Sequence, residues 1–174
     1  MKTKSTQVVL TAVFAALYCV GVVFLAPISF QIFQVRVADA LLPLAMLFGW
    51  PAIVGLSLGA FVANVFGGLG PVDMVGGAVA NFIATLAAWG LVKSRGRRWM
   101  LVGVGIEIAV VTLVVGTYLS YLLAIPITIS WLGILLGSLT AIGVLGSILL
   151  YTLSRRNLAT MLGTHGLSGN RRGS

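Results

Sequence analysis

Charged residues are scarce in this sequence. They make up 8% of its 174 residues, only three of them acidic, whereas hydrophobic residues make up 59%. A soluble domain carries about 25% charged residues, so the composition excludes a soluble fold. We predict a single all-α integral membrane protein, in agreement with a mean hydropathy of +1.11.

Cysteine and histidine are nearly absent as well. Cys19 stands alone in an apolar run, which excludes a disulfide framework and a cysteine-based metal site. The single histidine, His165, lies in the polar tail, and the sequence has no cluster of metal ligands and no evident nucleophile–base pair. A Gly-x-x-x-x-Gly-Lys-[Ser/Thr] phosphate loop is also missing. We therefore expect no catalytic residue, no metal and no cofactor, and a membrane enzyme is disfavoured.

The net charge of +8 comes from cations gathered at a few places. Lys2 and Lys4 precede the first apolar run, the stretch 93–98 holds four cations, and Arg155 and Arg156 follow the last run. The positive-inside rule places cations at such positions on the cytoplasmic side. The basic charge therefore predicts topology and contact with anionic lipid, with no nucleic-acid partner.

The apolar stretches predict a bundle of six transmembrane helices, at about residues 6–26, 36–48, 51–66, 74–92, 99–123 and 131–153. The second stretch is short for a bilayer, which needs about 20 residues, so 36–66 could instead form one kinked helix. Six spans put both termini and the cations of 93–98 on one side, which favours six spans with cytoplasmic ends. Residues 1–153 then form one domain, followed by a basic tail at 154–174 that we expect to be disordered.

This topology gathers polar residues in the outer half of the membrane, where such groups are costly and commonly mark a ligand site. The candidates are Arg36, Asp39, Asn64, Asp73 and Asn81. Other roles stay open for each: a mutual Arg36–Asp39 salt bridge, an N-cap for Asp73 directly before the fourth span, and interhelical hydrogen bonds for the two asparagines.

Two further features concern the fifth and sixth spans. Tyr118, Tyr121 and Trp131 lie near the outer surface, where they could be interfacial anchors or, for Tyr118, a ligand contact. Glu107 lies deeper and shares a helical stripe with Tyr118, eleven residues away. This glutamate could be neutral, paired with a cation or part of a proton path.

Small residues at four-residue spacing predict close helix packing. They occur as Gly55-xxx-Gly59, as Gly133-xxx-Gly137, as Ala12-xxx-Ala16, and as a stripe of Ala80, Ala84 and Ala88.

The order of motifs resembles a known family. Gln34-Val35-Arg36-Val37-Ala38-Asp39-Ala40-Leu41, then Ala63-Asn64 and Leu69-Gly70-Pro71-Val72-Asp73, are similar to the QueT family over about residues 5–155. Members of that family are substrate-binding S-components of energy-coupling factor (ECF) transporters. The resemblance implies six helices with both ends inside, and docking of Ala12 and Ala16 on a transmembrane coupling subunit.

The resemblance also implies a function. The chain would bind a micronutrient from outside, either a queuosine precursor (a deazapurine) or another vitamin such as cobalamin, and would work in the cell membrane with the coupling subunit and two ATPase subunits. Substrate contacts would come from Gln34, Phe33 and Tyr118 together with the outer polar residues. The alternative is a stand-alone proton-coupled transporter or channel, acting as a homo-oligomer with Glu107 and Asp39 as proton carriers. Co-purification with ATPase subunits would distinguish the two functions.

Overall fold

The structure is a computed structural model that describes residues 4–25 and 36–155. These ranges are helical and contain no strand. The long helices are α1 (Lys4–Phe24), α4 (Trp50–Gly67), α5 (Pro71–Arg95) and α6 (Met100–Leu122). The last apolar stretch is continuous from α7 (Ile127–Ser138) through the π-helical segment η3 (Leu139–Gly146) to α8 (Ser147–Arg155).

Five of these helices are long and apolar enough to cross a membrane, which confirms a multi-pass helical protein. The predicted boundaries agree with the structure within about four residues, which is close to the usual uncertainty of helix ends. The fourth and sixth predicted spans lengthen most, and both are extended at each end, to 71–95 and 127–155. The second predicted span, residues 36–48, is shorter than the others and differs from them in helix type.

That short segment consists of the 3-10 helix η1 (Val37–Leu44) and one α-helical turn, α3 (Ala45–Phe48). Pro43 lies inside η1, and α-helical winding begins only at Ala45. Proline cannot donate a backbone hydrogen bond, and in an α-helix its ring clashes with the carbonyl four residues back. The 3-10 rise of about 2.0 Å per residue also lets twelve residues reach further than an α-helix would.

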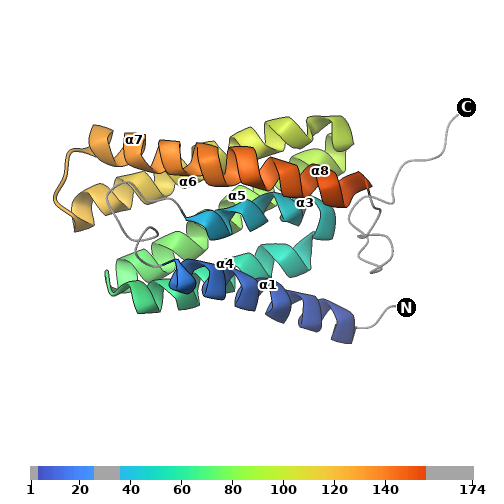
Figure 1. The fold of residues 1–174 in the computed structure, drawn as a ribbon, viewed down its shortest axis with the longest axis horizontal. Helices are drawn as coiled ribbons and strands as arrows, with labels where there is room; N and C mark the ends of the chain where they lie inside the picture. Colours follow the sequence, from blue (N-terminus) through green and yellow to red (C-terminus); the bar gives the residue numbers. More distant parts are fainter. Residues whose placement is uncertain (1–3, 26–35, 156–174) are drawn as a thin grey trace, which may run out of the picture.

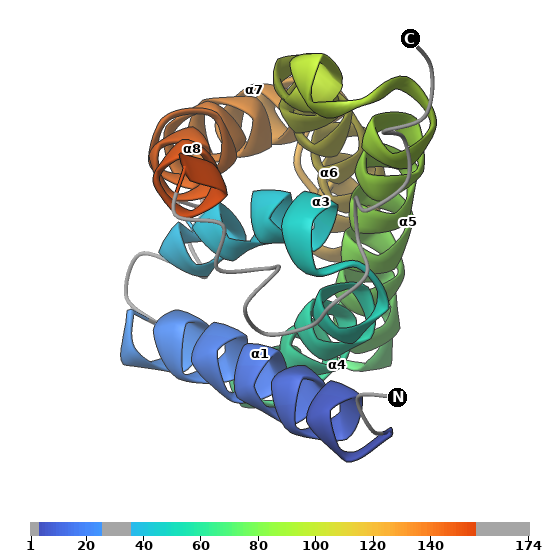
Figure 2. The same cartoon turned by 90° about the vertical axis from the view of Figure 1, so that its right-hand side faces the viewer.

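The η1–α3 segment lies in the middle of the bundle. Figure 2 shows it enclosed by α1, α4, α5, α6 and the α7–α8 helix, and all of its residues except Val37 and Leu41 are buried. A short or irregular helix is tolerated at membrane depth when protein surrounds it. The segment is therefore a central helix that need not span the lipid by its own length.

The ends of the helices alternate between the two ends of the bundle. In Figure 1, α1 begins and α8 ends at the same end as the α5–α6 connection, while the connections after α4 and α6 lie at the opposite end. We call the end with the connections after α4 and α6 the outer end, following the predicted topology. The side of the membrane that each end faces, and the number of spans, stay predictions.

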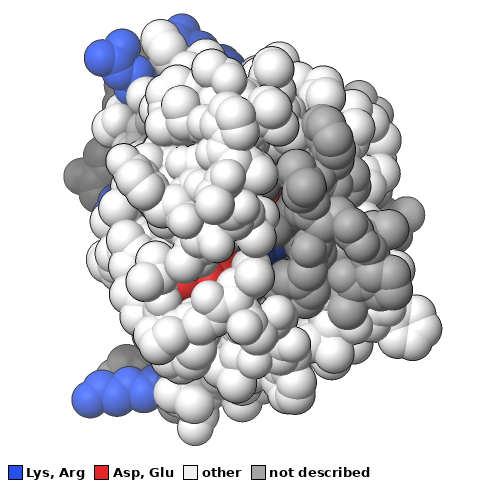
Figure 3. All heavy atoms as spheres, turned by 90° about the vertical axis from the view of Figure 1, so that its left-hand side faces the viewer, with Lys and Arg blue, Asp and Glu red and all other residues white. Residues whose placement is uncertain are grey.

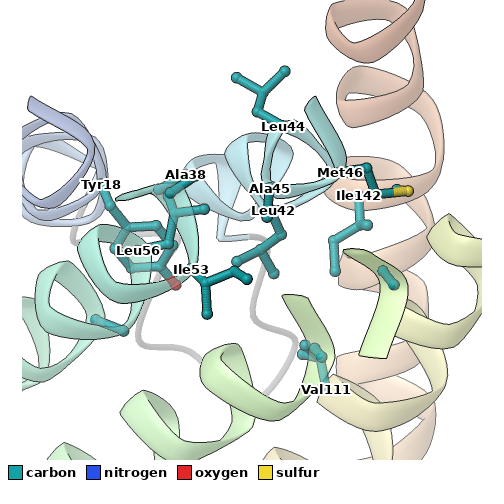
Figure 4. Packing of buried hydrophobic residues seen from close by; sticks show 14 of the residues in the cluster. Tyr18, Ala38, Leu42, Leu44, Ala45, Met46, Ile53, Leu56, Val111 and Ile142 are labelled. Atoms are coloured by element: carbon teal, nitrogen blue, oxygen red, sulfur yellow. The ribbon is translucent and has the colours of Figure 1, made fainter. Parts of the chain in front are cut away.

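The apolar core surrounds the inner half of the central helix. Leu42, Ala45 and Met46 lie between α4, α6 and η3, where Figure 4 shows them beside residues such as Ile53 and Ile142. The turn that follows agrees with the prediction. Gly49 ends α3 at φ 66°, and Pro51 stands in the first turn of α4, where its missing N–H costs nothing.

Two of the predicted packing motifs make close helix contacts. A Cβ on Gly55 would lie 2.5 Å from the Thr11 carbonyl oxygen, and one on Gly59 would lie 2.7 Å from that of Ala15. Glycine is therefore required where α4 packs on α1. Ala80, Ala84 and Ala88 of α5 are fully buried, so this stripe also faces the interior.

Candidate functional site

The first turn of α5 brings Asp73 into the bundle. The N-cap of α5 is Gly70, and Asp73 lies three residues inside the helix, with no exposed surface. The expectation that Asp73 directly precedes the span is therefore wrong, and the alternative role of an N-cap, which the sequence left open, is excluded. Pro71 explains the difference, because proline at the first helical position starts the helix three residues earlier, at residue 71.

Asp73 is the meeting point of three other segments. The Tyr118 hydroxyl of α6 donates to Asp73 Oδ1 at 2.9 Å, and Arg36 Nη2, at the start of η1, lies 3.8 Å from the same oxygen. Asn64, in the last turns of α4, donates from Nδ2 to the Asp73 backbone carbonyl at 2.8 Å. The structure thus brings four of the predicted site residues together at the outer end.

Gly77 makes room for this arrangement. A Cβ at this position would overlap Asn64 Nδ2 and would lie 3.6 Å from the Tyr118 hydroxyl oxygen. Even alanine would therefore displace the amide of Asn64. The sequence singled out no role for Gly77, because the need for it arises from contact between α4, α5 and α6.

Asp39 forms a second centre one turn inward along η1. Its Oδ1 accepts a hydrogen bond of 2.5 Å from the hydroxyl of Tyr18, which is fully buried on α1. Asp39 also interacts electrostatically with Arg36. Tyr18 was missed by the sequence reasoning, although a tyrosine in the middle of the first apolar run is far from the interfacial positions that usually hold one.

Asn81 lies on α5 two turns inward of Asp73 and is 4% exposed. Its amide is close to the Tyr18 hydroxyl, but Nδ2 makes no hydrogen bond of ordinary geometry with any described residue. Asn81 therefore lies beside the Asp39 centre, two helical turns inward of Asp73.

Several buried polar atoms in this cluster lack a hydrogen-bond partner within residues 4–25 and 36–155. They are Asn64 Oδ1, Asp73 Oδ2 and Asn81 Nδ2. Most buried polar groups in native proteins are satisfied, so each exception requires an explanation. Three such atoms around one set of side chains make this cluster the candidate binding site.

The remaining predicted residues are less closely involved. Tyr121 is 80% exposed and Trp131 is 37% exposed, as expected of interfacial anchors. Gln34 and Phe33 lie outside the described residues. Glu107 is fully buried on α6, and both of its carboxyl oxygens lack a hydrogen bond from the described part of the chain.

The outer end of the molecule is the face shown in Figure 3. Acidic atoms are visible between uncharged residues near the middle of this face, with basic atoms next to them. The cluster defined by Arg36, Asp39, Asn64, Asp73 and Asn81, with Tyr18 and Tyr118, is called the outer polar cluster from here on.

A multi-pass helical bundle with a buried, incompletely bonded polar cluster has the features of a membrane protein that binds a small polar molecule. The family model described as "QueT transporter" matches residues 8–155. This chain therefore belongs to the QueT transporter family, and it is a membrane transporter protein of the cell membrane. Neither a curated protein nor a solved structure matches it.

Proposed function

We propose that this chain is the substrate-binding subunit, or S-component, of an ECF-type importer, and that a deazapurine precursor of queuosine is its substrate. The outer polar cluster is the proposed binding site. The observation that carries the proposal is the set of three buried polar atoms without hydrogen bonds, Asn64 Oδ1, Asp73 Oδ2 and Asn81 Nδ2.

The chemistry of these atoms favours a guanine-like ring. Asn64 Oδ1 and Asp73 Oδ2 are acceptors, and Asn81 Nδ2 is a donor. A 7-deazaguanine offers the complement on one edge, since it has a ring N–H and an exocyclic amino group as donors and a carbonyl oxygen as acceptor. A buried polar group that stays unsatisfied costs about 1–3 kcal/mol, so a ligand that satisfies all three would be strongly preferred over one that does not.

An S-component must also dock on a coupling subunit, and the exposed face of α1 supports this part of the proposal. Phe14, Tyr18 and Val22 are the residues that α1 buries in the bundle. Ala12 and Ala16 are exposed on the opposite face, about 200° around the helix from Phe14. Small residues there would let a partner helix approach closely.

The energy source would lie on other polypeptides. The sequence has no phosphate-binding loop for ATP, and the proposed complex adds one transmembrane coupling subunit and two ATPase subunits. Purification in mild detergent followed by native mass spectrometry tests both parts of the proposal. We expect a retained deazapurine-sized ligand and co-purified ATPase subunits.

Two outcomes would count against the proposal. A retained ligand with the mass of cobalamin would move the substrate to another vitamin while keeping the importer type. Transport by the purified chain alone, without ATPase subunits, would favour a stand-alone proton-coupled transporter. The latter has one supporting observation, the buried and unbonded carboxyl of Glu107 within the described bundle.

A further inference from the structure

Four exposed cations lie at the inner end of the bundle, opposite the outer end. Residues 93–98, called the basic connection below, join α5 to the 3-10 turn η2 (Arg97–Trp99) and to α6. Its cations are Lys93, Arg95, Arg97 and Arg98. The chain has three carboxyl side chains, and all three are buried in the bundle. No carboxyl side chain of the protein therefore balances this surface charge, and an anion from outside the chain would complement it.

Two of these cations lie over tryptophan rings. Lys93 Nζ is 4.5 Å from the centroid of the Trp89 ring, and Arg95 Cζ is 5.0 Å from the centroid of the Trp99 ring. Such cation–π contacts hold a long basic side chain close to the ring face. Tryptophan is enriched at the level of the lipid headgroups. The contacts therefore place two cations of the basic connection at headgroup level.

A third tryptophan extends this aromatic surface from α5 onto α4, which lies beside it (Figure 2). The Trp50 ring centroid is 5.9 Å from that of Trp89 and 6.4 Å from that of Phe82. Trp50 is nevertheless 51% exposed, so half of its surface is left for another molecule. Because Trp50 and Lys93 both contact Trp89, an exposed aromatic ring and an exposed cation lie next to each other.

An apolar stripe on α5 leads from this surface toward the outer end. Val79, Phe82, Leu86, Trp89 and Lys93 follow one another at intervals of three or four residues, so they share one face of the helix. Val79 is exposed, and Phe82 and Leu86 are half-buried. The ten residues from 79 to 89 rise about 15 Å, which is half of a hydrocarbon core about 30 Å thick. The stripe therefore has the length of one lipid leaflet, with a cation at its inner end.

We propose that the basic connection, together with Trp50, binds one anionic glycerophospholipid from the membrane leaflet at this end. The lipid phosphate lies against Lys93 and is surrounded by the arginines of the basic connection, and an acyl chain follows the apolar stripe past Trp50. A lipid fits better than a soluble anion, because the cation and the apolar stripe are continuous on one face of α5. The site is separate from the outer polar cluster and does not depend on the substrate.

Native mass spectrometry of the purified full-length chain tests this site with two lipids that carry identical acyl chains. Phosphatidylglycerol has a net negative charge, and phosphatidylcholine has none. The native chain should bind one phosphatidylglycerol more than about tenfold more tightly than phosphatidylcholine, because each basic residue near an anionic lipid contributes a factor of about five. Lys93→Gln should weaken binding of phosphatidylglycerol about fivefold and leave that of phosphatidylcholine unchanged. Trp50→Ala should weaken both, because the ring contacts the shared apolar part.

Lys4→Gln is the matched control. Lys4 is exposed at the start of α1, at the same end of the bundle, so this variant removes the same charge from a different helix. It should leave the binding of both lipids at the native level. Lys93 is exposed as well, so neither lysine variant should change the melting temperature much.

Three results would overturn the lipid site. Equal binding of the two lipids by the native chain would mean that charge does not select the occupant. Equal weakening by Lys93→Gln and Lys4→Gln would show a diffuse attraction to anionic lipid in place of a defined site. Displacement of phosphatidylglycerol by excess inorganic phosphate would identify a soluble anion as the occupant. Each of these results leaves the function proposed above untouched, because the substrate takes no part in the experiment.

Discussion

Alanine at position 81 should separate ligand binding from stability. The Asn81 side chain is buried, and its Nδ2 makes no hydrogen bond of ordinary geometry to the described residues. Removing it therefore breaks no donor hydrogen bond of ordinary geometry in the protein without ligand, and loses only the close approach to the Tyr18 hydroxyl. If Asn81 Nδ2 donates to the ligand, Asn81→Ala leaves a ligand acceptor unsatisfied, at a cost of about 1–3 kcal/mol.

That cost can be expressed as an affinity. Since about 1.4 kcal/mol is tenfold in Kd, Asn81→Ala should weaken binding of 7-deazaguanine by roughly 5-fold to 150-fold. Calorimetry of the purified chain in detergent measures this change directly. A thermal melt without ligand measures stability on the same sample.

Asn64→Ala is the matched comparison, because it removes the same side chain from the same cluster. Asn64 does donate a hydrogen bond, from Nδ2 to the Asp73 carbonyl at 2.8 Å, and this bond joins α4 to α5. Asn64→Ala should therefore weaken binding and also lower the melting temperature, because the buried carbonyl of Asp73 loses a partner. Asn81→Ala should lower the melting temperature less.

Two results would refute this reasoning. Unchanged affinity in Asn81→Ala would mean that the unbonded amide does not face the ligand. A larger loss of stability in Asn81→Ala than in Asn64→Ala would mean that Asn81 is already bonded within the protein and that its role is structural.

Three further predictions follow from other parts of the bundle. Tyr18→Phe should lower the melting temperature, because it removes the 2.5 Å hydrogen bond to Asp39 and leaves a buried carboxyl oxygen unsatisfied; an unchanged melting temperature would contradict this. Ala16→Leu should reduce transport in cells while leaving ligand affinity intact. The control Ala109→Leu, on the exposed face of α6, should change neither transport nor affinity, and equal transport in the two variants would exclude α1 as the docking face. A cysteine at Ser94, in a background free of other cysteines, should react with an impermeant thiol reagent only from the cytoplasmic side, and labelling from outside would reject the predicted topology.

Most of the fold could be predicted from the sequence, because the long helices need only local signals. Continuous apolar runs, the cations between spans and the Gly49-Trp50-Pro51 break place the helices within a few residues of where they lie. The 3-10 geometry of η1 and the π-helical η3 were not predicted. Both depend on how the central segment packs against its neighbours, and hydropathy carries no signal for that packing.

The candidate site was predicted less completely, for a related reason. Arg36, Asp73 and Asn64 could be recognised because ionisable and amide groups are rare in apolar helices. The residues that contact the polar cluster, Tyr18 and Gly77, could not be recognised from the sequence. Tyr18 has the ordinary appearance of an aromatic residue in a membrane helix, and Gly77 that of a small packing residue, until the contacts with Asp39 and Asn64 are known.

The inner and outer halves of the central helix lie in different surroundings. Its inner half, with Leu42, Met46 and Phe48, is packed in the apolar core, whereas its outer end carries Arg36 and Asp39. Dense packing at the inner end can stabilise the fold while the outer end buries charged groups, with Arg36 beside Asp73 and Asp39 bonded to Tyr18, in line with the usual trade-off between stability and function. The atoms without hydrogen bonds, on α4 and α5, therefore lie around the outer end of a central helix whose inner end is held in place by the apolar core.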